Sequence, residues 1–94
     1  MFQGARAQDV SYYDVPKGDG PHDVAPAPDG TVWYTGQRAG VLGRLDPKTG
    51  AWTNYPLPRY SNLRRVFVDD RTSPVTVWAG NDHAAQVMKI EPLD

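Results

Sequence analysis

Val41-Leu42-Gly43-Arg44-Leu45-Asp46-Pro47 returns 45 residues later as Gln86-Val87-Met88-Lys89-Ile90-Glu91-Pro92. Two further segments also repeat, namely Thr31-Val32-Trp33 as Thr76-Val77-Trp78, and residues 11–16 (SYYDVP) as 53–58 (TNYPLP). A fixed period of 42 to 45 residues, made of short apolar runs and turn residues, is typical of propeller blades. A blade is a four-stranded sheet that cannot bury its faces alone, so the sequence predicts two stacked units.

Strand and turn signals fill both units. Pro28-Asp29-Gly30 is a strong hairpin signal, and Asp46-Pro47-Lys48-Thr49-Gly50 has the residue order of a type I turn followed by a left-handed residue. Runs such as Thr31-Val32-Trp33-Tyr34-Thr35 are rich in the β-branched and aromatic residues that favour strands. We expect strands at 22–27, 31–35, 41–45 and 51–55, and again at 63–69, 75–79 and 87–91. The fold class is therefore all-β, a β-propeller with two blades per chain.

The order of these strands predicts an exchange between chains. If the four strands of a blade are labelled a to d from the centre outward, the chain reads d-abcd-abc. Residues 1–8 form a tail, 9–16 an outer strand, 20–58 the first blade, and 59–94 a second blade without its outer strand. Two blades are too narrow to close into a ring, so residues 9–16 are expected to complete the second blade of another copy. Three or four copies would then form a cyclic homo-oligomer, a trimer or tetramer with six or eight blades. The alternative is that the sequence is a fragment of a longer propeller.

Composition limits the partners and the chemistry. Ten Lys and Arg against eleven Asp and Glu give no global field for nucleic acid or an anionic membrane, and neither partner is expected. No apolar run reaches the length of a membrane helix. The absence of cysteine excludes disulfides, thiolate metal sites and cysteine nucleophiles. Ala5-Arg6-Ala7 has the small-x-small form of a signal cleavage site, so localisation stays open, with export to a bacterial periplasm as one alternative.

Three motifs resemble the repeat of virginiamycin B lyases, also called streptogramin lyases. They are Gly20-Pro21-His22-Asp23-Val24-Ala25, residues 28–37 (PDGTVWYTGQ) and residues 42–50 (LGRLDPKTG). The second unit matches more loosely, through Val77-Trp78-Ala79-Gly80 and 87–92. The resemblance implies a seven-bladed propeller that confers antibiotic resistance by opening type B streptogramins, through Mg²⁺-dependent elimination. Since two-blade chains cannot sum to seven, the resemblance implies either a six- or eight-bladed relative or a piece of a longer protein.

His22 is the candidate catalytic residue. The resemblance places the proton-abstracting histidine of the family in a Pro-His motif, which matches Pro21-His22. A histidine at the start of an innermost strand lies where loops gather around the central channel, and it changes protonation near neutral pH. A ring of copies would also bring equivalent His22 side chains around one axis, as a cation or anion site. The alternative is a structural histidine that bonds a neighbouring strand or loop.

A magnesium site is a weaker prediction. The family's metal-linked carboxylates precede a Pro-His motif and follow the Trp of the second strand, but Gly20 and Gln37 stand there in the first unit. In the second unit Asp82 offers a carboxylate that Mg²⁺ accepts. His83 follows it, and Gln37 and His83 are candidate ligand-binding residues. The alternative for Asp82 and His83 is an ordinary polar hairpin tip.

Arg64 is the third candidate ligand-binding residue, because it occupies the position of His22 in the second unit. Strand alternation predicts that Arg64 and Arg65 point to opposite faces, so that at most one of them lines the channel mouth with His22. The alternative is that the arginines of this region pair with surface acids such as Asp69 or Asp70. Trp33 and Trp78, repeated once per unit, are predicted to pack between blades.

Two functions from different classes follow. One is a lyase-like propeller that binds a small cyclic or peptidic molecule and, as a carbon–oxygen lyase, uses His22 as a base. The other is a non-catalytic ring that binds a ligand or a partner protein. The missing carboxylates favour the second, and the Pro-His motif favours the first.

Overall fold

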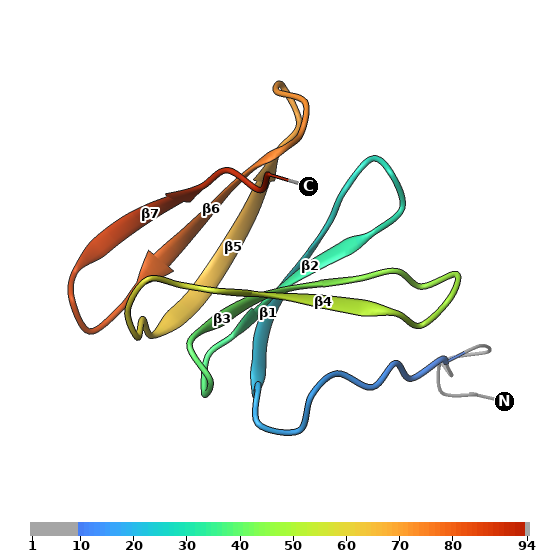
Figure 1. Ribbon diagram of the computed structural model, residues 1–94, viewed down its shortest axis with the longest axis horizontal. Coiled ribbons are helices and arrows are strands. Elements are labelled where there is room, and N and C mark those ends of the chain that lie inside the picture. Colours follow the sequence, from blue (N-terminus) through green and yellow to red (C-terminus); the bar gives the residue numbers. More distant parts are fainter. Residues whose placement is uncertain (1–9, 94) are drawn as a thin grey trace, which may run out of the picture.

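The computed structural model describes residues 10–93, which form two antiparallel sheets and no helix (Figure 1). The strands are β1 (Pro21–Pro26), β2 (Val32–Gly36), β3 (Val41–Leu45), β4 (Trp52–Pro56), β5 (Leu63–Asp69), β6 (Thr76–Asn81) and β7 (Gln86–Ile90). The predicted tail at 1–8, with Ala5-Arg6-Ala7, lies outside the described residues, as do Asp9 and Asp94. None of the described residues belongs to a helix that is long and apolar enough to cross a membrane.

Each sheet is a simple meander, as expected for a propeller blade. Blade 1 has the order β1-β2-β3-β4, and blade 2 has the order β5-β6-β7. The all-β fold class is confirmed. The predicted strands at 41–45 and 63–69 coincide with β3 and β5, and the other strands differ from their predicted ranges by one or two residues.

The predicted turns form through their own side chains. In the β1–β2 hairpin, Asp29 Oδ1 accepts from the Thr31 backbone amide at 2.9 Å and from the Thr31 hydroxyl at 2.6 Å, while Gly30 has φ +89°. These two bonds lower the pKa of Asp29 below its usual value. Pro, Asp and Gly thus each supply one requirement of a tight reversal.

The two blades pack face to face around Trp33. Its side chain is 2% exposed and clusters with Leu42 of its own blade and Val77 of blade 2, both fully buried. The Tyr55 ring stacks on Trp33 with centroids 5.4 Å apart. Truncating a buried tryptophan usually costs about 3–5 kcal/mol, so this contact accounts for a large part of the stability of so small a fold. The prediction that Trp33 packs between blades is therefore confirmed.

Tyr34 crosses β3 on the opposite face of blade 1. It pairs directly with Gly43, and a Cβ at Gly43 would overlap its ring. The phenol hydroxyl donates to Asp19 Oδ2 at 2.7 Å, which satisfies a carboxylate whose residue is only 3% exposed. Burial raises the pKa of Tyr34, and the bond to Asp19 raises it further by a smaller amount. A glycine in mid-strand is thus explained by the ring that lies over it.

Residues 10–16, which fall in the predicted outer strand at 9–16, form no strand within the chain. Figure 1 shows this segment running from the start of β1 away from β7.

We predict that Gly43→Ala lowers the free energy of unfolding by about 1–3 kcal/mol, because the added methyl group displaces the Tyr34 ring from the core. Urea denaturation followed by tryptophan fluorescence measures this. Gly80→Ala is the matched control, since it is also a strand glycine but has no atom within 4 Å of the added Cβ. Equal destabilisation by the two substitutions would contradict the packing of Tyr34 on Gly43.

The raised pKa of Tyr34 predicts that the folded chain loses stability at alkaline pH. Its folded pKa is raised, so the folded chain keeps the phenol proton where an unfolded tyrosine, with a pKa of about 10, releases it. The contribution to stability is complete below pH 10 and falls as the pH rises above it. Urea midpoints at pH 9 and pH 11 should show a smaller decrease for Tyr34→Phe than for the parent chain. A decrease of the same size in both proteins would contradict the assignment.

Candidate functional site

The inner strands β1 and β5 each carry a bulge near their first residue. In β1, Pro21 pairs with Gly36 and Asp23 with Thr35, so His22 is the extra residue. In β5, the shift falls between Leu63 and Val66 and so includes Arg64, which follows Leu63 as His22 follows Pro21. Bulges interrupt the alternation of side chains and redirect them, often beside binding sites. The same redirected position is therefore a histidine in blade 1 and an arginine in blade 2.

His22 bridges the two blades. Its Nδ1 lies 2.8 Å from the backbone oxygen of Arg64. A carbonyl oxygen only accepts, so Nδ1 carries the proton and Nε2 keeps its lone pair. Within residues 10–93, Nε2 has no hydrogen-bond partner, and the side chain is exposed. The bond is of the structural kind, and it orients Nε2 toward solvent.

Arg64 connects His22 to the β6–β7 turn. Its Nη1 lies 3.4 Å from Asp82 Oδ2, and the same oxygen lies 3.9 Å from His83 Nε2. The Arg64 and Asp82 side chains are 45% and 50% exposed. Exposed pairs of this kind contribute at most about 1 kcal/mol, so the contact is easily exchanged for a ligand. The surface acid that pairs with Arg64 is therefore Asp82. Asp69, the predicted partner, binds Arg71 instead at 2.7 Å, and the hydrogen bond from Arg71 lowers the pKa of Asp69 to about 2.

Gln37 belongs to the same network through Asn62. Gln37 Nε2 donates to Asn62 Oδ1 at 3.2 Å, and the Asp82 amide donates to the Asn62 backbone oxygen at 3.0 Å. In blade 1 the equivalent backbone bond runs from the Gln37 amide to Gly20 at 3.2 Å. All five predicted site residues (His22, Gln37, Arg64, Asp82 and His83) therefore lie in one chain of contacts, which we call the inner-end cluster.

Asp23, which no motif in the sequence singled out, joins the two inner strands beside this cluster. Asp23 Oδ2 accepts from the Val66 amide of β5 at 3.0 Å, and Oδ1 accepts from Val24 at 3.1 Å. Aspartate is disfavoured inside strands, so its place between Pro21-His22 and Val24 was a usable signal for an acceptor role. Asp23 holds β1 against β5 and so keeps His22 next to Arg64.

The inner-end cluster does not fit a magnesium ion. Among residues 10–93, no group of three His, Cys, Asp or Glu side chains is placed to hold a metal. Asp82 contributes one carboxylate, and that carboxylate faces the positive Arg64. Magnesium prefers hard oxygen ligands, and a neighbouring guanidinium opposes it electrostatically. Magnesium binding stays a prediction of the resemblance, and no chemical step is derived through it.

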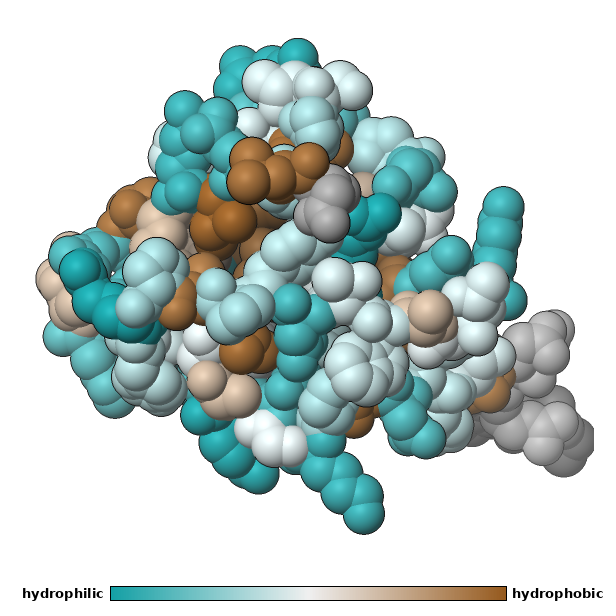
Figure 2. Space-filling model, viewed as in Figure 1, coloured by the Kyte–Doolittle hydropathy of each residue, from teal (hydrophilic) through white to brown (hydrophobic). Residues whose placement is uncertain are grey.

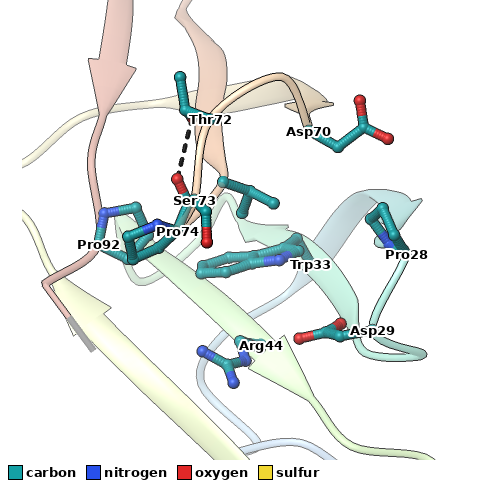
Figure 3. Close-up of a pocket in the computed structure, with 10 residues that line it drawn as sticks. Pro28, Asp29, Trp33, Arg44, Asp70, Thr72, Ser73, Pro74 and Pro92 are labelled. Carbon is teal, nitrogen blue, oxygen red and sulfur yellow. Dashed lines mark hydrogen bonds between the residues drawn. The ribbon is translucent and has the colours of Figure 1, made fainter.

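A second candidate site lies at the other end of the inner strands. A pocket of about 450 Å³ opens between the β1–β2 turn and the β5–β6 loop. Figure 3 shows the Trp33 ring at its base, with Arg44 on one side and Pro74 on the other. The Arg44 guanidinium carbon lies 5.5 Å from the Trp33 ring centroid, which is a cation–π distance. The residues that line this pocket include none of the predicted site residues, which lie at the opposite end of the inner strands.

Comparison with solved structures identifies the architecture. No protein-family model and no curated protein sequence matches the chain. The selenomethionine-substituted virginiamycin B lyase from Staphylococcus aureus is 18% identical, with a TM-score of 0.60 over 83% of this chain and 29% of the lyase. A catalytically inactive histidine-to-alanine variant of the same lyase, with quinupristin, is 16% identical with a TM-score of 0.61 over the same shares. A streptogramin B lyase structure is 16% identical, with a TM-score of 0.63 over 87% of this chain and 30% of its own.

At these identities the likeness concerns the fold, and the chain spans under a third of the length of each solved lyase. The resemblance noted in the sequence is confirmed at that level. Residues 10–93 have the fold of a two-blade segment of a virginiamycin B lyase propeller.

Proposed function

We propose that the inner-end cluster binds a small, carbonyl-rich molecule of the cyclic depsipeptide class to which type B streptogramins belong. One observation supports this most directly. His22 is bonded through Nδ1 to the backbone oxygen of Arg64, which leaves its Nε2 without a partner among residues 10–93, and the Arg64 side chain is itself 45% exposed. The likeness in fold to streptogramin lyases supports the choice of ligand class.

The Arg64 guanidinium is the main group that binds the carbonyl oxygens of the ligand. A guanidinium carries five donors in a planar fork, which suits the carbonyl oxygens of a peptide ring. The 3.4 Å contact with Asp82 orients it without occupying all of those donors. Gln37 and His83 lie at the edges of the cluster, where they contact the periphery of a bound ring.

A second candidate function is elimination on the same ligand, supported by the orientation of His22. In this reaction Nε2 takes the proton from the carbon next to a carbonyl group. The electron pair forms a carbon–carbon double bond, and the neighbouring ester C–O bond breaks to release a carboxylate. The Nδ1–H bond to the Arg64 carbonyl oxygen stabilises the resulting imidazolium.

We predict that Arg64→Ala weakens binding of quinupristin at least tenfold, or about 1.4 kcal/mol, because the ligand loses its charged donor. Isothermal titration calorimetry on the 94-residue chain measures this. Arg71→Ala is the matched control, since Arg71 pairs with Asp69 at the opposite end of β5 and should leave the affinity unchanged. Equal affinities for the parent chain and both variants would contradict the proposed site.

The orientation of His22 predicts its tautomer. In its neutral form His22 should carry the proton on Nδ1, whereas the exposed His83, which has no carbonyl acceptor among the described residues, should favour the Nε2–H form of free histidine. Long-range ¹H–¹⁵N spectra at mildly alkaline pH distinguish the two. An Nε2–H tautomer at His22 would remove the proton acceptor from the elimination.

Turnover separates the two candidate functions. Elimination leaves the mass of quinupristin unchanged while opening its ring, whereas hydrolysis adds a water molecule. Chromatography with mass detection should show the isomeric product for the parent chain and none for His22→Ala. Binding without any product would support the non-catalytic function.

A further inference from the structure

The outer edge of β7 is an open sheet edge with a hollow on each face. β7 pairs with β6 on one side, and no other described residue pairs with its second side. A hollow of about 320 Å³ lies between β7 and residues 57–61, and another of about 210 Å³ lies on the opposite face over Trp78 and Val87. Figure 2 shows apolar side chains exposed along β7. Open, apolar sheet edges are sites for pairing with another strand.

Blade 1 shows how such an edge is completed. There β4 pairs with β3, with Tyr55 opposite Leu42, and the Tyr55 ring stacks on Trp33. Arg44 Nη1 donates to the Tyr55 hydroxyl at 3.3 Å and lies over the same tryptophan. One ring from the fourth strand therefore completes a cluster of tryptophan, tyrosine and cation.

Blade 2 repeats this cluster without its tyrosine. Trp78 pairs with Lys89 as Trp33 pairs with Arg44, and the Lys89 ammonium lies 6.0 Å from the Trp78 ring. No ring stacks on Trp78 among the described residues, and the side chain is 37% exposed. Its neighbour Val87, in the position of Leu42, is 79% exposed, whereas Leu42 is fully buried.

Residues 10–16 have the sequence and spacing of the missing strand. They match residues 52–58, which places Tyr13 at the position of Tyr55. Tyr13 precedes Pro21, the first residue of β1, by eight positions, and Tyr55 precedes Leu63, the first residue of β5, by the same number. The entry loops also match, because the Gly20 and Asn62 backbone oxygens accept equivalent amide bonds. A strand at 10–16 would therefore lead into blade 1 as β4 leads into blade 2.

The segment does not pair with β7 of its own chain. Asp19, just after it, is fixed to blade 1 by the Tyr34 hydroxyl and by the Arg38 amide at 3.0 Å. Figure 1 shows the segment leaving blade 1 on the side away from β7. Tyr13 is 46% exposed and pairs with no strand, so the segment is available to another chain.

We propose that residues 10–16 of a second copy pair antiparallel with the outer edge of β7, and that Tyr13 of that copy stacks on Trp78 opposite Val87. The alternation of a strand then places Val10 and Tyr12 in the hollow beside residues 57–61. Blade 1 of the same copy covers Trp78, as blade 2 covers Trp33. The interface is head-to-tail, and in the proposed assembly its rotation closes into a ring, for which three or four copies give six or eight blades.

Disulfide cross-linking in a chain without native cysteine tests the register. Arg44 pairs with Thr53 in blade 1, so Lys89 should face Ser11 of the second copy. A mixture of Ser11→Cys and Lys89→Cys chains should form a covalent heterodimer after mild oxidation, since directly paired strand residues lie within disulfide range. The mixture of Asp14→Cys and Lys89→Cys chains is the matched control, three residues out of register, and should form at least tenfold less heterodimer.

The molar mass of the parent chain and of Tyr13 variants tests whether the assembly forms and whether it needs the Tyr13 ring. Light scattering should give a trimer or tetramer for the parent chain and for Tyr13→Phe, which keeps the ring, and at least a tenfold higher midpoint concentration for Tyr13→Ala. A parent chain that stays monomeric at every concentration would overturn the proposal. So would a Ser11→Cys/Lys89→Cys double variant that cross-links only within one chain, or equal yields from the matched and shifted pairs. An assembly unaffected by Tyr13→Ala would overturn the placement of its ring on Trp78.

Discussion

The burial of Trp33 between the two blades is the contact on which the rest of the structure depends. A four-stranded meander has two faces and too few residues to bury either alone, so each blade is stable only against another. Trp33, with Tyr55 on its ring and Val77 across the interface, sets how closely and at what angle the blades meet. β1 then lies beside β5, where the Asp23 carboxylate accepts a hydrogen bond from the Val66 amide.

The inner-end cluster is a product of this stacking. His22 reaches the Arg64 carbonyl oxygen because the blades are adjacent, and Asp82 reaches Arg64 because β6 and β7 hold their turn above β5. No single blade contains the site. Any substitution that rotates one blade against the other therefore changes the separation of these polar groups before it changes the fold of either sheet.

The strands were predictable from the sequence because their signals are local. Pro28-Asp29-Gly30 and Gly50 mark reversals, and apolar residues recur within the strands at 41–45 and 63–69. The bulges at His22 and Arg64 were not, since a strict alternation of faces contains no sign of an extra residue. Two further features could not be predicted from the sequence, namely the pairing of Arg64 with Asp82 and the pocket over Trp33. Both depend on how distant segments meet in space. The resemblance and the internal repeat together named the residues of the inner-end cluster, while their connection through Asn62 required the structure.

The loop tips of both blades are held by main-chain atoms, through the bonds from the Gln37 amide to Gly20 and from the Asp82 amide to Asn62. Backbone anchoring makes the shape of the tips depend less on the identity of their side chains. Gln37 and Asp82 occupy the same place in the two blades and already differ in charge. Such tips form a natural position for diversification, where a protein engineer or evolution can exchange recognition groups one blade at a time without redesigning the scaffold.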